Sequence, residues 1–343
     1  MTPVYVLERK TTSEDLSLAG VYWRRLGIDV QVSIYLAAAR SLGYDATAVL
    51  YDAIRKPDLL PLKATPVELR KYTKPTKKDP VSRLYANQRE SDETPDEYFR
   101  RCLDAIKEDP ERYFRRGVIT RLESELDEAR ADVWQTSTAI RDARRLRVFP
   151  RNADSCIQWS RVCDYFAVCC GEQSIDDPVL FRKNEKKHVE LDGLSADMMT
   201  IWYPDGTSET KPDTRELLTQ SSLRAYRSCP RKYFYRYELQ MRPLKADAEP
   251  LRQGKSVHAA LESWSKSGGD LELALTCLDK EDPYKYAKEA AMVTGYHARW
   301  EKPTGVIAVE KEWQMELVNP ETGAASRTFR LGGKMDGVVE VGA

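Results

Sequence analysis

The first 55 residues alternate between apolar runs of strand length and one helix. Residues 3–10 switch between apolar and polar positions with a period of two, which predicts a strand. Residues 22–42 then carry apolar side chains at helical spacing, and residues 49–54 form a second run of strand length. This order predicts an α/β protein.

The middle of the chain changes character three times. Residues 56–80 are rich in Pro and Lys, which indicates a surface loop or arm. Residues 95–146 hold Glu/Arg pairs four residues apart and little continuous apolar stripe, which favours a solvated helical hairpin over an element that grips DNA. Residues 171–218 are acidic, rich in turn residues and aperiodic at their centre, so we expect a linker there.

Regular periodicity returns in the last third of the chain. Helices are expected over residues 219–241, 254–264 and 283–300, and strands over residues 306–318 and 328–341. These patterns predict two core segments, at residues 1–55 and 213–343. Between them lie a loop with a charged helical insertion (56–150), a cysteine segment (151–182) and a linker (183–212).

Composition narrows the setting of the protein. Lys+Arg and Asp+Glu both number 54, so the net charge is zero and gives no argument for a nucleic-acid partner. No apolar run approaches the roughly 18 residues of a membrane span, and the first residues lack a secretory core. We therefore expect a cytoplasmic protein without a membrane partner, in which seven cysteines indicate metal or cluster ligation rather than disulfides.

Acidic residues stand in strand segments at both ends of the sequence. Glu8 and Lys10 are two residues apart, so their side chains face the same side of a strand, and Asp336 lies between glycines at the start of the last apolar run. Carboxylates that hold Mg²⁺ or Mn²⁺ beside a lysine supply what phosphodiester hydrolysis requires. If the tail were joined to the head, the two strands would form a β-hairpin, with Ala343 close to Met1.

Three cysteines are grouped in an apolar and aromatic stretch, and a fourth stands apart. The group is Cys156, Cys163 and Cys169, and the fourth is Cys229, which precedes a proline. Four thiolates suit a cubane iron–sulfur cluster and a zinc ion equally well, and the spacing does not separate the two. Either group requires Cys229 to lie close to Cys156.

The acidic motifs resemble those of the RecB-like branch of the PD-(D/E)XK nucleases, which includes phage exonucleases. In that family an Asp and a Glu-x-Lys follow one another on adjacent strands, so the resemblance implies that Asp336, Glu8 and Lys10 are catalytic. Residues 254–262, Gly-Lys-Ser-Val-His-Ala-Ala-Leu-Glu, are similar to the family's first motif. This similarity implies that His258 joins Asp336 and Glu8 as a ligand of Mg²⁺ or Mn²⁺.

Further positions extend the resemblance. Gln31 and Tyr35 share one helical face and are similar to the family's Gln-x3-Tyr motif, which faces the active site or DNA. Glu310 and Glu312 both resemble an acidic position on the family's first strand, and the choice between them stays open. Relatives hold a [4Fe–4S] cluster with one cysteine before the nuclease core and three after it, which implies the ligands Cys229, Cys156, Cys163 and Cys169.

The resemblance covers nearly the whole chain once residues 213–343 are placed before residues 1–182. It implies a restriction-endonuclease-like mixed sheet flanked by helices, in circularly permuted order, with a helical insertion and an iron–sulfur subdomain. Pairing of the two permuted halves between copies would produce a homo-oligomer.

A basic and aromatic segment precedes the core motifs of the last third. Its cations are Arg224, Arg227, Arg231, Lys232 and Arg236, and they interleave with five aromatic residues between 226 and 237. The cations could bind phosphates while the aromatic rings stack on bases. Alternatively, the rings face the core and the basic side is solvated, and both interpretations stay open.

These observations lead to two hypotheses about function. The first is a metal-dependent DNA exonuclease of phage or bacterial recombination or repair, acting on single strands or duplex ends beside a recombination partner protein. The second is a non-catalytic iron–sulfur or zinc module that binds DNA or acts as a scaffold with a degenerate nuclease fold.

Overall fold

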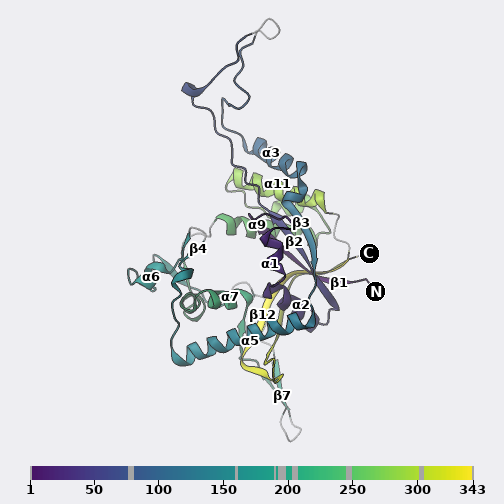
Figure 1. Ribbon diagram of the computed structural model, residues 1–343, viewed down its shortest axis with the longest axis vertical. Helices are drawn as coiled ribbons and strands as arrows, with labels where there is room; N and C mark the ends of the chain where they lie inside the picture. Colours follow the sequence, from purple (N-terminus) through teal and green to yellow (C-terminus); the bar gives the residue numbers. More distant parts are fainter. Residues whose placement is uncertain are drawn as a thin grey trace.

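A mixed β-sheet lies at the centre of the molecule, with helices on both faces (Figure 1). The computed structural model describes residues 2–75, 81–158, 161–188, 191, 198–202, 208–244, 249–300 and 305–341. The strand order is β11-β12-β1-β2-β3, and β9 pairs with β12 outside this path. The expected α/β architecture is confirmed, with strands β1 (Val4–Thr12), β2 (Ala46–Arg55), β3 (Phe114–Ile119), β9 (Glu216–Leu218), β11 (Val306–Val318) and β12 (Ala325–Glu340).

The first and last strands of the chain are neighbours in this sheet. β1 pairs antiparallel with β12, from Val4 opposite Glu340 to Leu7 opposite Gly337, and parallel with β2 on its other side. The main-chain nitrogen of Val341 donates to the carbonyl oxygen of Pro3 at 3.1 Å. The predicted pairing of these two strands is therefore confirmed, while the expected proximity of Met1 and Ala343 concerns residues outside the described part of the chain.

Two hydrophobic clusters cover the two faces of the sheet. One joins apolar residues of β1 and β2 to helices α2 (Val30–Ser41) and α5 (Glu123–Leu146). The other joins Ile54 and Phe114 to three helices on the opposite face (Figure 1). These three are α3 (Pro95–Glu108), α9 (Glu249–Lys266) and α11 (Pro283–Arg299), and shorter helices elsewhere are α1 (Val21–Leu26), α4 (Pro110–Tyr113) and α10 (Leu271–Thr276).

The prediction of a helical hairpin over residues 95–146 is wrong at its centre. Between α3 and α5 the chain forms β3, which pairs antiparallel with β2 and ends the sheet. The two adjacent charged residues Arg115 and Arg116 interrupt the apolar and polar alternation that would predict this strand. The guanidinium of Arg116 is nevertheless anchored, because it donates two hydrogen bonds to Asp52, at 2.6 and 2.7 Å.

The predicted helix over residues 219–241 is also wrong, because it is broken at Cys229. Helix α7 (Gln220–Ser228) ends there, and Cys229 has an extended backbone with φ −160° and ψ 111°. The ring of Pro230 clashes with a helical conformation of the preceding residue, which explains the break. Helix α8 (Pro230–Tyr233) and a π-helical turn, η3 (Phe234–Glu238), follow.

Two segments outside the core carry more order than a plain loop. Residues 56–75 and 81–94 extend away from the body as an arm that contains a 3-10 turn, η1 (Val67–Leu69), and a bridge between Tyr72 and Leu84 (Figure 1). The stretch expected to be a linker contains β6 (Phe181–Lys183), which pairs with β10 (Met241–Pro243), and the hairpin of β7 (Met198–Trp202) and β8 (Ser208–Pro212). Among the described residues, no helix is long and apolar enough to cross a membrane.

Candidate metal centre

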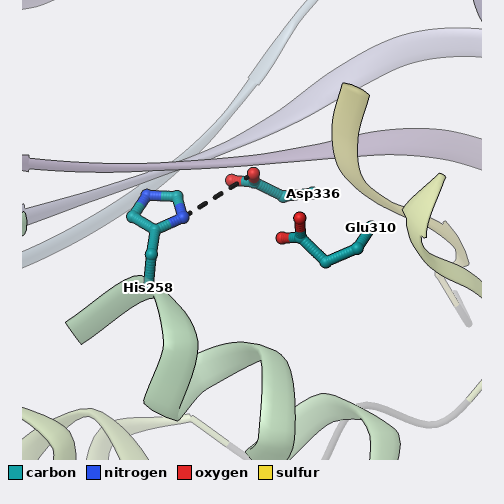
Figure 2. Close-up of side chains that lie close together, drawn as sticks. All are labelled: His258, Glu310 and Asp336. Atoms are coloured by element: carbon teal, nitrogen blue, oxygen red, sulfur yellow. Dashed lines mark ion pairs between the residues drawn. The ribbon is translucent and has the colours of Figure 1, made fainter. Parts of the chain in front are cut away.

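Three potential metal ligands converge from one helix and two strands. His258 comes from α9, Glu310 from β11 and Asp336 from β12, and one ligand atom of each lies within 4.8 Å of the others (Figure 2). Within the described ranges this is the one group of three or more His, Cys, Asp or Glu side chains that meets so closely. The structure therefore brings together two of the three predicted metal ligands, His258 and Asp336.

Hydrogen bonding fixes which nitrogen of His258 faces the site. Nε2 lies 2.8 Å from the carbonyl oxygen of Arg9, which can only accept a hydrogen bond, so Nε2 carries the proton. In the neutral ring Nδ1 is then unprotonated, and it lies 3.7 Å from Oδ1 of Asp336 (Figure 2). A histidine held in this way is preorganised to bind a metal ion through Nδ1.

The close approach of α9 to β1 depends on a glycine. A Cβ atom at Gly254 would lie 2.9 Å from Oγ1 of Thr11, a distance shorter than van der Waals contact. Gly254 is one helical turn before His258, so a larger side chain would push the imidazole away from the sheet. This contact gives a physical role to the glycine that precedes the histidine in the motif.

Glu310, and not Glu312, is the acidic residue of β11 that joins His258 and Asp336 in the triad. Val309 lies opposite Gly337 and Lys311 opposite Met335, so the register sets Glu310 across from Asp336. Glu310 has φ 51°, a left-handed conformation that costs about 1–3 kcal/mol in a residue other than glycine and is concentrated at functional sites.

The electrostatic environment of Glu310 is that of a partly buried acidic group. Burial raises the pKa of Glu310, the ammonium of Lys334 opposes the shift, and the neighbouring Asp336 adds to it. Nζ of Lys334 lies 2.6 Å from Oε2 of Glu310. Two carboxylates this close together favour a bound cation.

Arg9, the middle residue of Glu-x-Lys, braces the site from behind. Its main-chain nitrogen donates to Oδ2 of Asp336 at 2.6 Å, while its carbonyl oxygen accepts from His258. Its buried guanidinium donates to Ser265 at 2.8 Å and to the hydroxyl of Tyr296 at 3.2 Å. The main chain of one residue therefore orients two of the three ligands.

Glu8 and Lys10 lie beside the triad. As predicted, both side chains face the same side of β1, and they form an ion pair. Burial raises the pKa of Glu8, an effect that Lys10 opposes and Asp336 increases. Burial by itself would lower the pKa of Lys10, but the carboxylates of Glu8 and Asp336 outweigh it, so Lys10 carries a proton.

Gln31 and Tyr35 of α2 point toward Glu8 and the interior of the protein. Nε2 of Gln31 donates to Oε1 of Glu8 at 2.9 Å. Tyr35, one turn later, is buried with its ring edge-on to Trp313, the centroids being 6.1 Å apart. Gln31 therefore orients the Glu8 carboxylate, while Tyr35 supports the wall of the site.

The segment with three cysteines folds back against the break at Cys229. The side chains of Asn152 and Ser155 both donate to the carbonyl oxygen of Ser228 at 2.8 Å. Cys163 and Cys169 pack with aromatic residues near η3, and burial raises the pKa of both thiols. All seven cysteines are free thiols, and within the described residues no three of their sulfurs lie within 4.8 Å of one another.

The basic segment contains three exposed cations, Arg224, Arg227 and Arg236, and two half-buried ones, Arg231 and Lys232. Tyr233, Tyr235 and Tyr237 are buried, so these rings face the core and base stacking by them is excluded. Arg227 donates to Oγ1 of Thr136 at 2.9 Å, and Arg231 donates to the carbonyl oxygen of Phe149 at 2.8 Å. Lys232 is half-buried, and Arg224 is exposed on α7.

Two residues of the site are not predicted from the sequence. Arg9 and Lys334 each lie within two residues of a motif carboxylate, and neither was assigned a role from the sequence. The sequence does carry a signal for Arg9, because the strand alternation turns this charged side chain toward the interior. No local signal identifies the partner of Lys334, because Glu310 is on another strand.

Comparison with known proteins gives one match. Neither curated proteins nor solved structures yield a match to the chain. The sequence model of the PD-(D/E)XK nuclease superfamily matches residues 217–343, the part of the chain that contributes His258, Glu310 and Asp336.

Proposed function

We propose that the protein is a metal-dependent DNA nuclease whose Mg²⁺ or Mn²⁺ is held by His258, Glu310 and Asp336. The observation that carries the proposal is the convergence of these three ligands next to the Glu8–Lys10 pair. One imidazole nitrogen and two carboxylates are a donor set that suits a hard divalent cation with open positions for water and phosphate. The superfamily match supports phosphodiester cleavage as the reaction.

The residues of the site divide the work of hydrolysis between them. A bound divalent cation polarises the phosphate and lowers the pKa of a bound water. Lys10 keeps its proton between Glu8 and Asp336 and can donate hydrogen bonds to the attacking water or to the phosphate. Arg9 keeps the proton of His258 on Nε2, and Gln31 orients Glu8, which we propose as a further acidic ligand.

Two finer features belong to the same proposal. We infer an exonuclease of recombination or repair, an inference that rests on the resemblance of the motifs to phage exonucleases. We also infer a circularly permuted order of the family's parts, because His258 and Asp336 follow Glu8 and Lys10 in this chain. The antiparallel pairing of β12 with β1 supports the second inference.

The four cysteines Cys156, Cys163, Cys169 and Cys229 are proposed to hold a [4Fe–4S] cluster. The segment that carries the first three contacts the break at Cys229, because Asn152 and Ser155 both donate to the carbonyl oxygen of Ser228. Four thiolates suit zinc and an iron–sulfur cluster equally well, and the preference for iron–sulfur rests on the resemblance to relatives that hold such a cluster.

Digestion of end-labelled DNA tests the proposed reaction. Linear duplex, single-stranded and closed circular DNA would be incubated with Mg²⁺, Mn²⁺ or EDTA, using wild-type protein and His258→Ala. We expect metal-dependent release of labelled nucleotides from linear DNA alone. Nicking of the circle would point to endonuclease action. If wild type releases no more label than His258→Ala does, the protein is better explained as a scaffold that binds DNA without cutting it.

A further inference from the structure

Lys334 is the cation that neutralises Glu310 in the absence of metal. Its Nζ lies 2.6 Å from Oε2 of Glu310, and Glu310 is one of the three converging ligands. The Lys334 side chain is 34% exposed, so it reaches the site from its solvent side, whereas Glu310 is 16% exposed. The pair therefore lies at the entrance of the site rather than in the core.

A divalent cation and Lys334 compete for the same carboxylate. The ligand atoms of Glu310 and Asp336 lie within 4.8 Å of each other, so the two carboxylates repel and a cation beside them stabilises both. Lys334 precedes Asp336 by two residues on β12, which brings its ammonium to the same side of the strand. A metal ion bound to Glu310 would neutralise the carboxylate in place of Lys334.

We propose that Lys334 is an exchangeable counter-ion, bound to Glu310 without metal and released to a phosphate of the DNA strand when Mg²⁺ or Mn²⁺ occupies the site. This inference rests on the proposed nuclease function for the identity of the phosphate. An ammonium with three donors and a flexible stem is suited to such a transfer, because it binds a carboxylate or a phosphate as a point charge. Released beside the metal, it stabilises charge on the substrate only after the metal has bound.

Manganese titration in a double-mutant cycle tests the exchange. Wild type, Lys334→Gln, Glu310→Gln and the double variant would be titrated with Mn²⁺ by calorimetry. If Lys334 competes with the metal for Glu310, Lys334→Gln binds Mn²⁺ about fivefold more tightly than wild type, as expected for loss of a half-exposed ion pair. The gain must vanish in the Glu310→Gln background.

A matched control separates exchange from a general effect of charge. Lys266 forms an ion pair with Glu262 on the same helix as His258, outside the triad, so Lys266→Gln removes an equal charge nearby. We expect it to leave the Mn²⁺ affinity almost unchanged. Equal affinities of wild type and Lys334→Gln, or an equal gain for Lys266→Gln, would overturn the exchange.

Unfolding in the two metal states provides a second readout that does not need a Glu310 variant. With EDTA, Lys334→Gln should lower the free energy of unfolding, because Glu310 loses its partner. At saturating Mn²⁺ this loss should disappear. A loss of equal size in both conditions would show that Lys334 stays on Glu310 and would contradict the exchange.

DNA binding in Ca²⁺ tests where Lys334 goes. We expect Lys334→Gln to weaken DNA binding and to reduce its salt slope by about one when Ca²⁺ is present, and to do neither in EDTA. An unchanged slope in Ca²⁺ would refute transfer to a phosphate. Because the Mn²⁺ titration requires no DNA, failure of the nuclease proposal and failure of the exchange remain distinguishable.

Discussion

The main-chain nitrogen of Arg9 lies 2.6 Å from Oδ2 of Asp336, although 327 residues separate them in the chain. This hydrogen bond lies just beyond Leu7 and Gly337, the last paired residues of β1 and β12, and it joins the Glu-x-Lys segment to the triad. The same residue accepts a hydrogen bond from His258 through its carbonyl oxygen. The metal centre is thus assembled around the backbone of β1.

Removal of the Arg9 side chain should weaken this assembly. Arg9 is 3% exposed and its guanidinium donates to Ser265 and Tyr296, so Arg9→Met removes two buried hydrogen bonds from a charged donor. We expect a loss of about 3 kcal/mol in the free energy of unfolding, measured by urea denaturation. Arg25→Met, which removes an exposed ion pair with Glu14, should cost less than about 1 kcal/mol, and equal losses would contradict the bracing role.

Acid should act on the sheet through Asp213. Hydrogen bonds from Arg215 lower the pKa of this carboxyl to about 2, and Arg330 contributes as well. Because the folded pKa lies below the unfolded one, the stabilisation is complete above the unfolded pKa and is lost as the pH falls toward 2. Relative to Asp213→Asn, wild type should lose about 1 kcal/mol between about pH 5 and pH 3. Parallel urea curves for both proteins across this window would contradict the assignment.

The cluster proposal predicts a coloured protein. Wild type purified without oxygen should contain iron and show visible charge-transfer absorption. Cys229→Ser removes the thiol at the break after α7 and should abolish both signals, whereas Cys277→Ser, which changes an exposed thiol, should keep them. Zinc without iron in wild type would refute the iron–sulfur assignment.

Contacts to DNA should depend on the exposed Arg224 more than on the half-buried Arg231. Arg224 is exposed, while Arg231 is held by the carbonyl oxygen of Phe149. We expect Arg224→Ala to reduce the salt slope of DNA binding by about one, and Arg231→Ala to lower stability while the slope stays the same. Fluorescence anisotropy across a salt series measures the slope, and an unchanged slope for Arg224→Ala would remove this residue from the interface.

Much of the sheet could be predicted from local patterns. The runs that became β1, β2, β11 and β12 alternate or are continuously apolar, and a period of two correctly put Glu8 and Lys10 on one side. β3 is not predicted from its local pattern, because Arg116 on this strand pairs with Asp52, a partner that only the folded sheet supplies. Pro230 is a local signal against a helical conformation at Cys229, although the residues on both sides of it carry helical spacing.

The candidate site was less accessible to sequence reasoning. His258 and Asp336 could be found through motifs, but the choice between Glu310 and Glu312 depends on a left-handed backbone at Glu310 and on its register against β12. The partners of Arg9 and Lys334 come from other strands and helices. Such contacts are set by tertiary packing, which no local pattern encodes.

Single-turnover cleavage of end-labelled linear DNA in Mn²⁺ tests the central claim most directly. Wild type would be compared with Asp336→Asn and with Glu312→Gln, a carboxylate on β11 outside the triad. We predict that Asp336→Asn lowers the rate by about a hundredfold or more, while Glu312→Gln cleaves at nearly the wild-type rate. Equal rates for wild type and Asp336→Asn would contradict a metal-dependent nuclease centred on this triad.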